Sequence, residues 1–307
     1  MKLRRFAKLA ATVAVVGFVA TTESACSRSH IEAINLANEG DKSVKVNVER
    51  AVQLYEQAIQ LDPTNHLILW KLANAYEKKE DWDKMASTLS RAVQVAPEFA
   101  NYWYKRGHAL VKLAEAGNQD SFEQAKEPLK KCIEKDPNLS ECYYLMGESM
   151  EWTDDEQAAA DYYTKAIQHD PTVGFYYPYL AELYLRFKLD KEAVQVLEEG
   201  TKIVQPTDKN IPALYNMQIL LAQAALMRGD KAGQLAAVEK AEKYAGEKRP
   251  EFSFNLGSTY ATMDPPQKEK AVRLLTQFTK RICKGANAKK FQEQCEEASS
   301  LLQKLGS

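Results

Sequence analysis

The sequence lacks an excess of charge of either sign, because 41 Lys and Arg residues stand against 42 Asp and Glu residues. The resulting net charge of -1 gives no broad basic field that would attract phosphate backbones, so nucleic acid is not an expected partner. Sustained alternation of β-branched residues is also missing, apart from the short run Val44–Val48. We interpret that run as a turn, so the composition favours an all-α protein.

Motifs for catalysis or metal binding are missing as well. The four histidines are scattered and form no H-E-x-x-H pair: His30, His66, His108 and His169. The sequence has neither a glycine loop that cradles phosphate nor a nucleophile elbow. It therefore predicts no enzyme activity, no cofactor, no metal site and no small-molecule substrate.

A long apolar run occurs only at the N-terminus. The uncharged segment Leu9–Thr22 follows four cations and is too short to span a bilayer comfortably, which predicts a signal peptide over residues 1–25. Those residues contain four cations and one anion, so their removal leaves a net charge of -4. We expect export followed by a mildly acidic mature chain.

The residues that follow resemble a bacterial lipoprotein signal, in which small residues precede a cysteine that becomes the acylated first residue. Ser24 and Ala25 precede Cys26, although Glu23 lies where that pattern has Leu. The resemblance implies lipidation at Cys26 and a membrane anchor. Ser27, rather than Asp, implies the outer membrane, with the protein facing the periplasm. A soluble periplasmic protein and an uncleaved anchor are the alternatives.

Prolines recur through the chain at intervals of 34, 40, 34 and 35 residues: Pro63, Pro97, Pro137, Pro171 and Pro206. Between them one apolar template returns. Its best copy has large and small apolar residues at helical spacing, namely Leu69, Leu72, Ala73, Tyr76, Met85, Leu89 and Ala92. This pattern resembles the tetratricopeptide repeat over residues 30–282. The first helix of the N-terminal repeat, Ile31 to about Gly40, fits it least well.

The resemblance implies an all-α, right-handed superhelical solenoid of about six to seven helix-turn-helix repeats over residues 26–282. A capping helix is expected within residues 283–307. Gly and Ala at the small positions would let the two helices of each pair approach closely, and stacking would bury the outer faces. The interval of 40 predicts about six extra residues that lengthen the turn around Gly117.

Four cysteines remain besides Cys26, which is an even number in a chain destined for an oxidising compartment. Three pairings are possible. The simplest joins near neighbours across turns, Cys132 with Cys142 and Cys283 with Cys295. Alternatively, Cys132 is simply a small buried apolar residue.

In the tetratricopeptide family, set positions of each repeat line a concave groove. The fifth position carries an aromatic residue in three successive repeats, Trp70, Tyr104 and Tyr144. Neighbouring groove positions are mostly polar: Asn74, Lys78, His108, Lys112, Glu148, Glu151 and Trp152. Such a row suits an extended peptide or a partner helix. The alternative is that the rings only fill contacts between repeats.

The family resemblance also separates kinds of partner. Repeats that hold a chaperone C-terminus use Lys at the fifth position, where this chain has Trp70, so that partner is not expected. We expect a non-catalytic scaffold or adaptor lipoprotein that binds envelope proteins. It would assist assembly of a secretin, a type IV pilus or a gliding-motility complex. A periplasmic enzyme subunit and a peptidoglycan- or glycan-binding protein are the alternatives.

Overall fold

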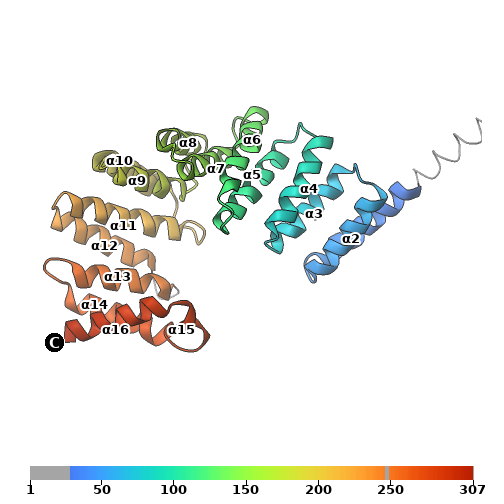
Figure 1. Cartoon of the computed structure of the whole chain (residues 1–307). Helices are drawn as coiled ribbons and strands as arrows, with labels where there is room; N and C mark the ends of the chain where they lie inside the picture. Colours follow the sequence, from blue (N-terminus) through green and yellow to red (C-terminus); the bar gives the residue numbers. More distant parts are fainter. Residues whose placement is uncertain (1–27, 246–248, 307) are drawn as a thin grey trace, which may run out of the picture. The chain divides into compact units, whose positions relative to one another are not determined.

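The computed structural model describes residues 28–245 and 249–306, and the expected all-α fold is confirmed throughout them (Figure 1). The predicted signal peptide and Cys26 lie outside the described residues. The chain divides into two compact units, Met1–Asp155 and Glu156–Ser307. We call them the N-terminal and the C-terminal unit.

The N-terminal unit consists of paired antiparallel helices. A helix over residues 28–43 precedes α2. The other helices are α2 (Val48–Leu61), α3 (His66–Lys78), α4 (Trp82–Val95), α5 (Ala100–Glu115), α6 (Asp120–Lys135) and α7 (Ser140–Trp152). Residues 44–47 form a turn, as predicted for the short β-branched run. Asn47, Asn65 and Asp81 cap their helices by accepting a backbone N–H, a contact that contributes about 1 kcal/mol each.

The C-terminal unit continues the same pattern. Its helices are α8 (Glu156–His169), α9 (Tyr176–Arg186), α10 (Asp190–Ile203), α11 (Ile211–Met227), α12 (Lys231–Ala245), α13 (Pro250–Thr262), α14 (Lys268–Arg281), α15 (Ala286–Lys290) and α16 (Gln292–Gly306). Three apolar clusters follow one another along the unit, and each is shared by consecutive helices. This serial core is the expected property of a stacked repeat.

Close approach within a pair depends on the small residues, as the sequence predicts. A Cβ at Gly107 in α5 would lie 2.5 Å from a methyl carbon of Leu129 in α6, a side chain that is fully buried. In the C-terminal unit Gly257 faces Leu275 in the same way, at 2.7 Å from Cγ. Any larger side chain at these glycines would force the helices apart.

The extra residues of the repeat at 100–137 were expected in the turn, and that expectation is wrong. Helices α5 and α6 have 16 residues each, whereas α3 and α4 have 13 and 14. The turn between α5 and α6 spans only residues 116–119. Most of the insertion therefore extends the helices, because each added helical residue gains a backbone hydrogen bond and lengthens the packed face.

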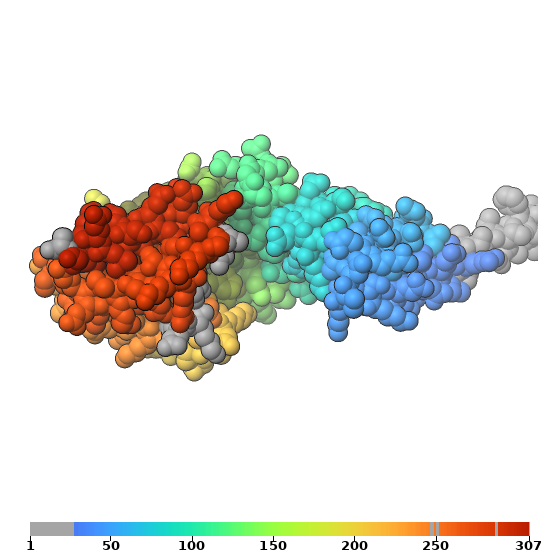
Figure 2. All heavy atoms as spheres, turned by 90° about the horizontal axis from the view of Figure 1, so that it is seen from below, coloured from blue at the N-terminus to red at the C-terminus, as the bar shows by residue number. Residues whose placement is uncertain are grey.

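The C-terminal cap differs in detail from the single helix expected. The chain turns at Phe291, between α15 and α16. The turn lets the Phe291 ring meet the Phe278 ring edge-on at 6.5 Å, while Cys295 is bonded to Cys283. In Figure 2 the orange and red residues of the last helices lie together in the C-terminal unit.

The structure contains two disulfides, Cys132–Cys142 and Cys283–Cys295. The first joins α6 to α7 across the turn at Pro137, and the second joins the end of α14 to α16. Both therefore connect elements that are neighbours in the stack, rather than the two helices of one pair.

Replacing Cys283 and Cys295 by Ser should destabilise the C-terminal unit by up to about 3 kcal/mol, the loop-closure entropy that such a crosslink removes from the unfolded chain. Because the apolar cluster around Phe278 and Ala298 remains, α16 should stay docked. Urea unfolding followed by circular dichroism measures the loss. An unchanged transition, or non-reduced peptide maps with free thiols in exported protein, would contradict the expectation.

Candidate functional site

The predicted groove residues lie on the first helices of three successive repeats, α3, α5 and α7. Within each helix they are spaced four apart or nearly so, which places them on one face. Helix α3 carries Trp70, Asn74 and Lys78. Helix α5 carries Tyr104, His108 and Lys112, and helix α7 carries Tyr144, Glu148, Glu151 and Trp152. Helix α5 contacts α7 directly. We call this surface the α3–α5–α7 face.

The three fifth-position aromatics are all half-buried. The Trp70 ring stacks on Tyr102 of the next repeat at 5.0 Å, so one side of Trp70 contributes to the contact between repeats. The Tyr104 ring stacks on His108 of its own helix at 6.1 Å. Burial, together with Glu141 and Glu77, raises the pKa of Tyr104 to about 12, so its hydroxyl stays protonated at neutral pH.

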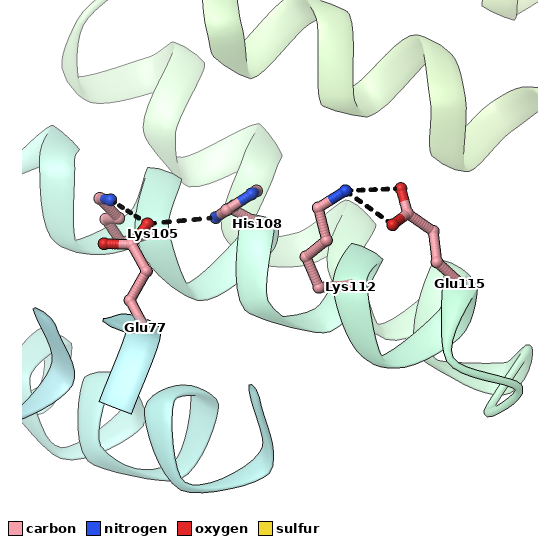
Figure 3. Close-up of polar contacts among 5 residues, drawn as sticks. All are labelled: Glu77, Lys105, His108, Lys112 and Glu115. Carbon is pink, nitrogen blue, oxygen red and sulfur yellow. Dashed lines mark hydrogen bonds and ion pairs between the residues drawn. The ribbon is translucent and has the colours of Figure 1, made fainter. Parts of the chain in front are cut away.

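A polar row crosses from α3 to α5 (Figure 3). The Lys105 ammonium donates to the Glu77 carboxylate, and both side chains are largely buried. Two turns further along α5, Lys112 donates to both carboxylate oxygens of Glu115, at 2.6 and 2.9 Å. Both lysines of the row are therefore already neutralised by carboxylates of the protein itself.

His108 lies between these two pairs. Burial, reinforced by Lys105, lowers its pKa to about 4, so the ring is neutral at pH 7. Its Nδ1 is 3.8 Å from the nearer Glu77 oxygen, too far for a hydrogen bond, and this buried atom has no hydrogen-bond partner among the described residues. The Trp82 ring packs against the imidazole at an interplanar angle of 76°, with the ring centroids 5.8 Å apart.

Glu148 extends the row onto α7 and is only 6 % exposed. Burial raises its pKa to about 7, and a side-chain hydrogen bond with Glu115 acts in the same direction, because two neighbouring carboxyls share a proton more readily than they both ionise. Tyr144 hydrogen-bonds to the same carboxyl. The row thus ends where the Glu148 side chain of α7 meets the Glu115 side chain of α5.

The remaining predicted residues are less central. The Asn74 amide donates to the Trp70 carbonyl within α3, at 2.9 Å, and Lys78 is exposed. Glu151 is half-buried. Trp152 is 58 % exposed and stacks on Phe122 of α6 at 5.2 Å, so it covers a second helix of the preceding repeat.

Sequence reasoning missed three charged members of the row, Glu77, Lys105 and Glu115. Glu77 lies at the twelfth position of its repeat, which is a groove position in the family, and could have been found from that. Lys105 and Glu115 lie outside the groove positions and are placed only by contacts between repeats. Within the described ranges, no group of three His, Cys, Asp or Glu side chains is arranged to hold a metal ion.

Comparison with known families bears on this arrangement of helices. Residues 19–202, more than half of the chain, match the family described as the tetratricopeptide repeat protein 21 C-terminal ARM domain. The chain belongs to this tetratricopeptide repeat family.

Individual relatives of this tetratricopeptide repeat protein are more distant. Anaphase-promoting complex subunit 3 of Schizosaccharomyces pombe is 26 % identical over 163 residues, which is 53 % of this chain and 23 % of that protein. The chain therefore spans less than a quarter of the length of this curated relative.

Two solved structures support the repeat fold. PilF of Pseudomonas aeruginosa superposes with a TM-score of 0.54 at 15 % identity, over 73 % of this chain and 97 % of that chain. MamA superposes with a TM-score of 0.51 at 22 % identity, over 56 % of this chain and 91 % of that chain. At these identities the likeness is one of fold alone.

Glu148 should make the stability of this tetratricopeptide repeat protein fall as the pH rises. Its pKa is raised from 4.5 to about 7, so the folded chain keeps a proton that the unfolded chain loses between these values. The wild type should therefore lose up to about 3 kcal/mol between about pH 5 and pH 8. Glu148→Gln should not show this loss, because an amide needs no proton to donate to Glu115.

Urea unfolding at several pH values, followed by circular dichroism, measures the difference between the two proteins. The His108 ring titrates in the opposite sense, losing stability as the pH falls towards 4. It is present in both proteins and cancels in the comparison. Parallel pH profiles for wild type and Glu148→Gln would show that the carboxyl pair does not hold a proton.

Proposed function

We propose that this protein is a non-catalytic adaptor that holds an extended segment or a helix of a partner protein on the α3–α5–α7 face. The observation that carries the proposal is the alignment of Trp70, Tyr104 and Tyr144. They are half-exposed rings at the same position of three consecutive repeats. Aromatic rings supply contact area at low entropic cost and are enriched among the residues that dominate interface energies.

The polar row indicates which partners suit this face. Lys105 and Lys112 are paired with Glu77 and Glu115, and His108 is neutral. A peptide carboxylate or a phosphate would have to compete with these internal pairs for its cations. The partner segment should therefore present apolar or aromatic side chains between polar ones, rather than a free C-terminus.

We further propose that the protein works in the bacterial cell envelope, anchored in the outer membrane through acylated Cys26 and facing the periplasm. Two disulfides are typical of an oxidising compartment and support export. Within residues 28–245 and 249–306, no helix combines the length and apolar character needed to cross a bilayer. Cys26 is two residues before the helix at 28–43, so acylation would hold the first repeat close to the membrane surface.

In this setting the adaptor would assist the assembly of a membrane machine, such as a secretin, a type IV pilus or a gliding-motility complex. The repeat architecture supports such a role, because it exposes a long face on which a partner can be held without a catalytic pocket. The partner itself has to be found by capture.

Trp70→Ala and Tyr104→Ala should each reduce recovery of the partner at least tenfold, because both remove a large ring from the centre of the contact. The measurement is affinity purification from cells after mild cross-linking, with the partner quantified by mass spectrometry. Trp70→Phe keeps a ring against Tyr102 and should retain more partner than Trp70→Ala. Tyr162→Ala, on α8, is the matched control and should leave recovery unchanged.

Helicity measured by circular dichroism should be the same in all four variants. Loss of helicity in Trp70→Ala and Tyr104→Ala would mean that the rings serve only the contact between repeats.

In the same experiment Cys26→Ala should move the protein from the membrane fraction to the soluble fraction and lose the envelope complex. Full recovery of that complex by Cys26→Ala would argue against the anchor.

A further inference from the structure

The turns between successive helices provide an internal comparison. Four have three residues and one conformation, with a left-handed middle residue: Glu80, Asp154, Lys188 and Gly229, whose φ values are 55°, 59°, 59° and 71°. In each turn the third residue donates its N–H to the carbonyl five residues earlier, at 2.9 to 3.0 Å. These turns are structurally equivalent, so differences between their side chains are informative.

Three of the turns have a polar first residue and end in Asp, at Asp81, Asp155 and Asp230. The turn between α9 and α10 has Phe187 and Leu189 at these two positions. Because leucine has no acceptor, α10 begins without a side-chain cap, whereas Asp81 accepts from the Lys84 amide and caps α4. Phe187 and Leu189 are 49 % and 41 % exposed. Unlike the three turns that end in Asp, this turn lacks a residue that could cap the next helix and exposes two apolar side chains. Such a departure from the local sequence preference is expected at binding sites.

The two apolar residues line a pocket of about 460 Å³ inside the C-terminal unit. Leu183 and Tyr184 of α9 complete its apolar side. The start of α8 supplies the other lining residues, Glu156, Gln157, Ala160 and Asp161. Ala160 is the smallest of the lining side chains and leaves room for an incoming group.

The charge of the pocket has one sign. Glu156 and Asp161 line it, and no Lys, Arg or His is among the lining residues. Neither carboxylate forms an ion pair with another residue in the part of the chain that the structure describes. Elsewhere on this protein carboxylates commonly pair with neighbouring cations, as Lys270 does with Glu239. Two unpaired carboxylates beside exposed apolar side chains are complementary to an apolar group with a cation next to it.

We propose that this pocket is a second protein-binding site, which accepts one large apolar side chain of a partner segment against Phe187 and Leu189. A Lys or Arg next to that side chain in the partner pairs with Glu156 and Asp161. The apolar contact supplies most of the affinity, and the carboxylates select the basic neighbour and make binding weaker at high salt. The site lies on α8, α9 and the turn that precedes α10. Its occupant need not be the partner held on the α3–α5–α7 face.

The test uses the full mature chain and three fluorescein-labelled Gly-Ser peptides that differ only in a central pair: Phe-Arg, Phe-Glu or Ala-Arg. Fluorescence anisotropy should show the Phe-Arg peptide binding at least tenfold more tightly than either of the others. Its affinity should fall as salt is raised. Equal binding of the three peptides, or no binding of the Phe-Arg peptide, would overturn the proposal.

Leu189→Asn separates binding from folding. Asparagine is among the best N-cap residues, so this variant should be at least as stable as the wild type in thermal unfolding. It should nevertheless bind the Phe-Arg peptide at least tenfold more weakly, because the apolar wall is lost. Ala160→Trp, which fills the pocket, should do the same, while Gln168→Trp on the exposed side of α8 should not.

The double variant Glu156→Lys and Asp161→Lys should reverse the selectivity and favour the Phe-Glu peptide. Glu192→Lys, a charge reversal on α10 outside the pocket, is its control and should leave the selectivity unchanged. Tight Phe-Arg binding that survives both Leu189→Asn and Ala160→Trp would place the peptide elsewhere and overturn the proposal. The results with these pocket variants do not depend on whether the α3–α5–α7 face binds a partner.

Discussion

The close contact between the two helices of each pair is the constraint on which the rest of the structure depends. Gly107 against Leu129, and Gly257 against Leu275, show how little space separates the paired backbones. The contact within a pair does not bury the apolar outer faces of its two helices. A pair is therefore stable only when neighbouring pairs cover these faces. The repeat spacing in the sequence, the serial apolar clusters and the need for a C-terminal cap all follow from it.

Stacking also explains how the row of aromatic residues on the α3–α5–α7 face arises from separate repeats. When pairs pile up in register, the same position of each first helix comes to the same side. Three aromatic residues that are 34 and 40 positions apart in the sequence then form a row. Charged residues of adjacent repeats are brought together by the same register, and Lys105 reaches Glu77 while Glu115 reaches Glu148. The face is therefore held by polar contacts between repeats as well as by the apolar core.

Much of the fold could be predicted from the sequence, because helix periodicity, small residues and prolines are local signals. The pairs from α3 to α14 lie where the repeat template places them. The extra residues near Gly117 were misplaced, because sequence spacing does not show whether an insertion extends a helix or a loop. Lys105 and Glu115 were missed because their roles come from neighbouring repeats. The burial of Glu148, which raises its pKa, likewise depends on how α5 and α7 pack.

The position of the disulfides has a mechanical consequence. In a stacked repeat each pair contacts only its neighbours, so a pulling force applied to the two ends of the chain would separate the pairs one after another. The Cys132–Cys142 bond crosses one of these joints, and the chain between its two cysteines cannot be drawn out while the bond is intact. The Cys283–Cys295 bond limits extension at the cap in the same way. Under tension the oxidised protein would therefore extend less than the reduced protein, by the residues enclosed at these two joints.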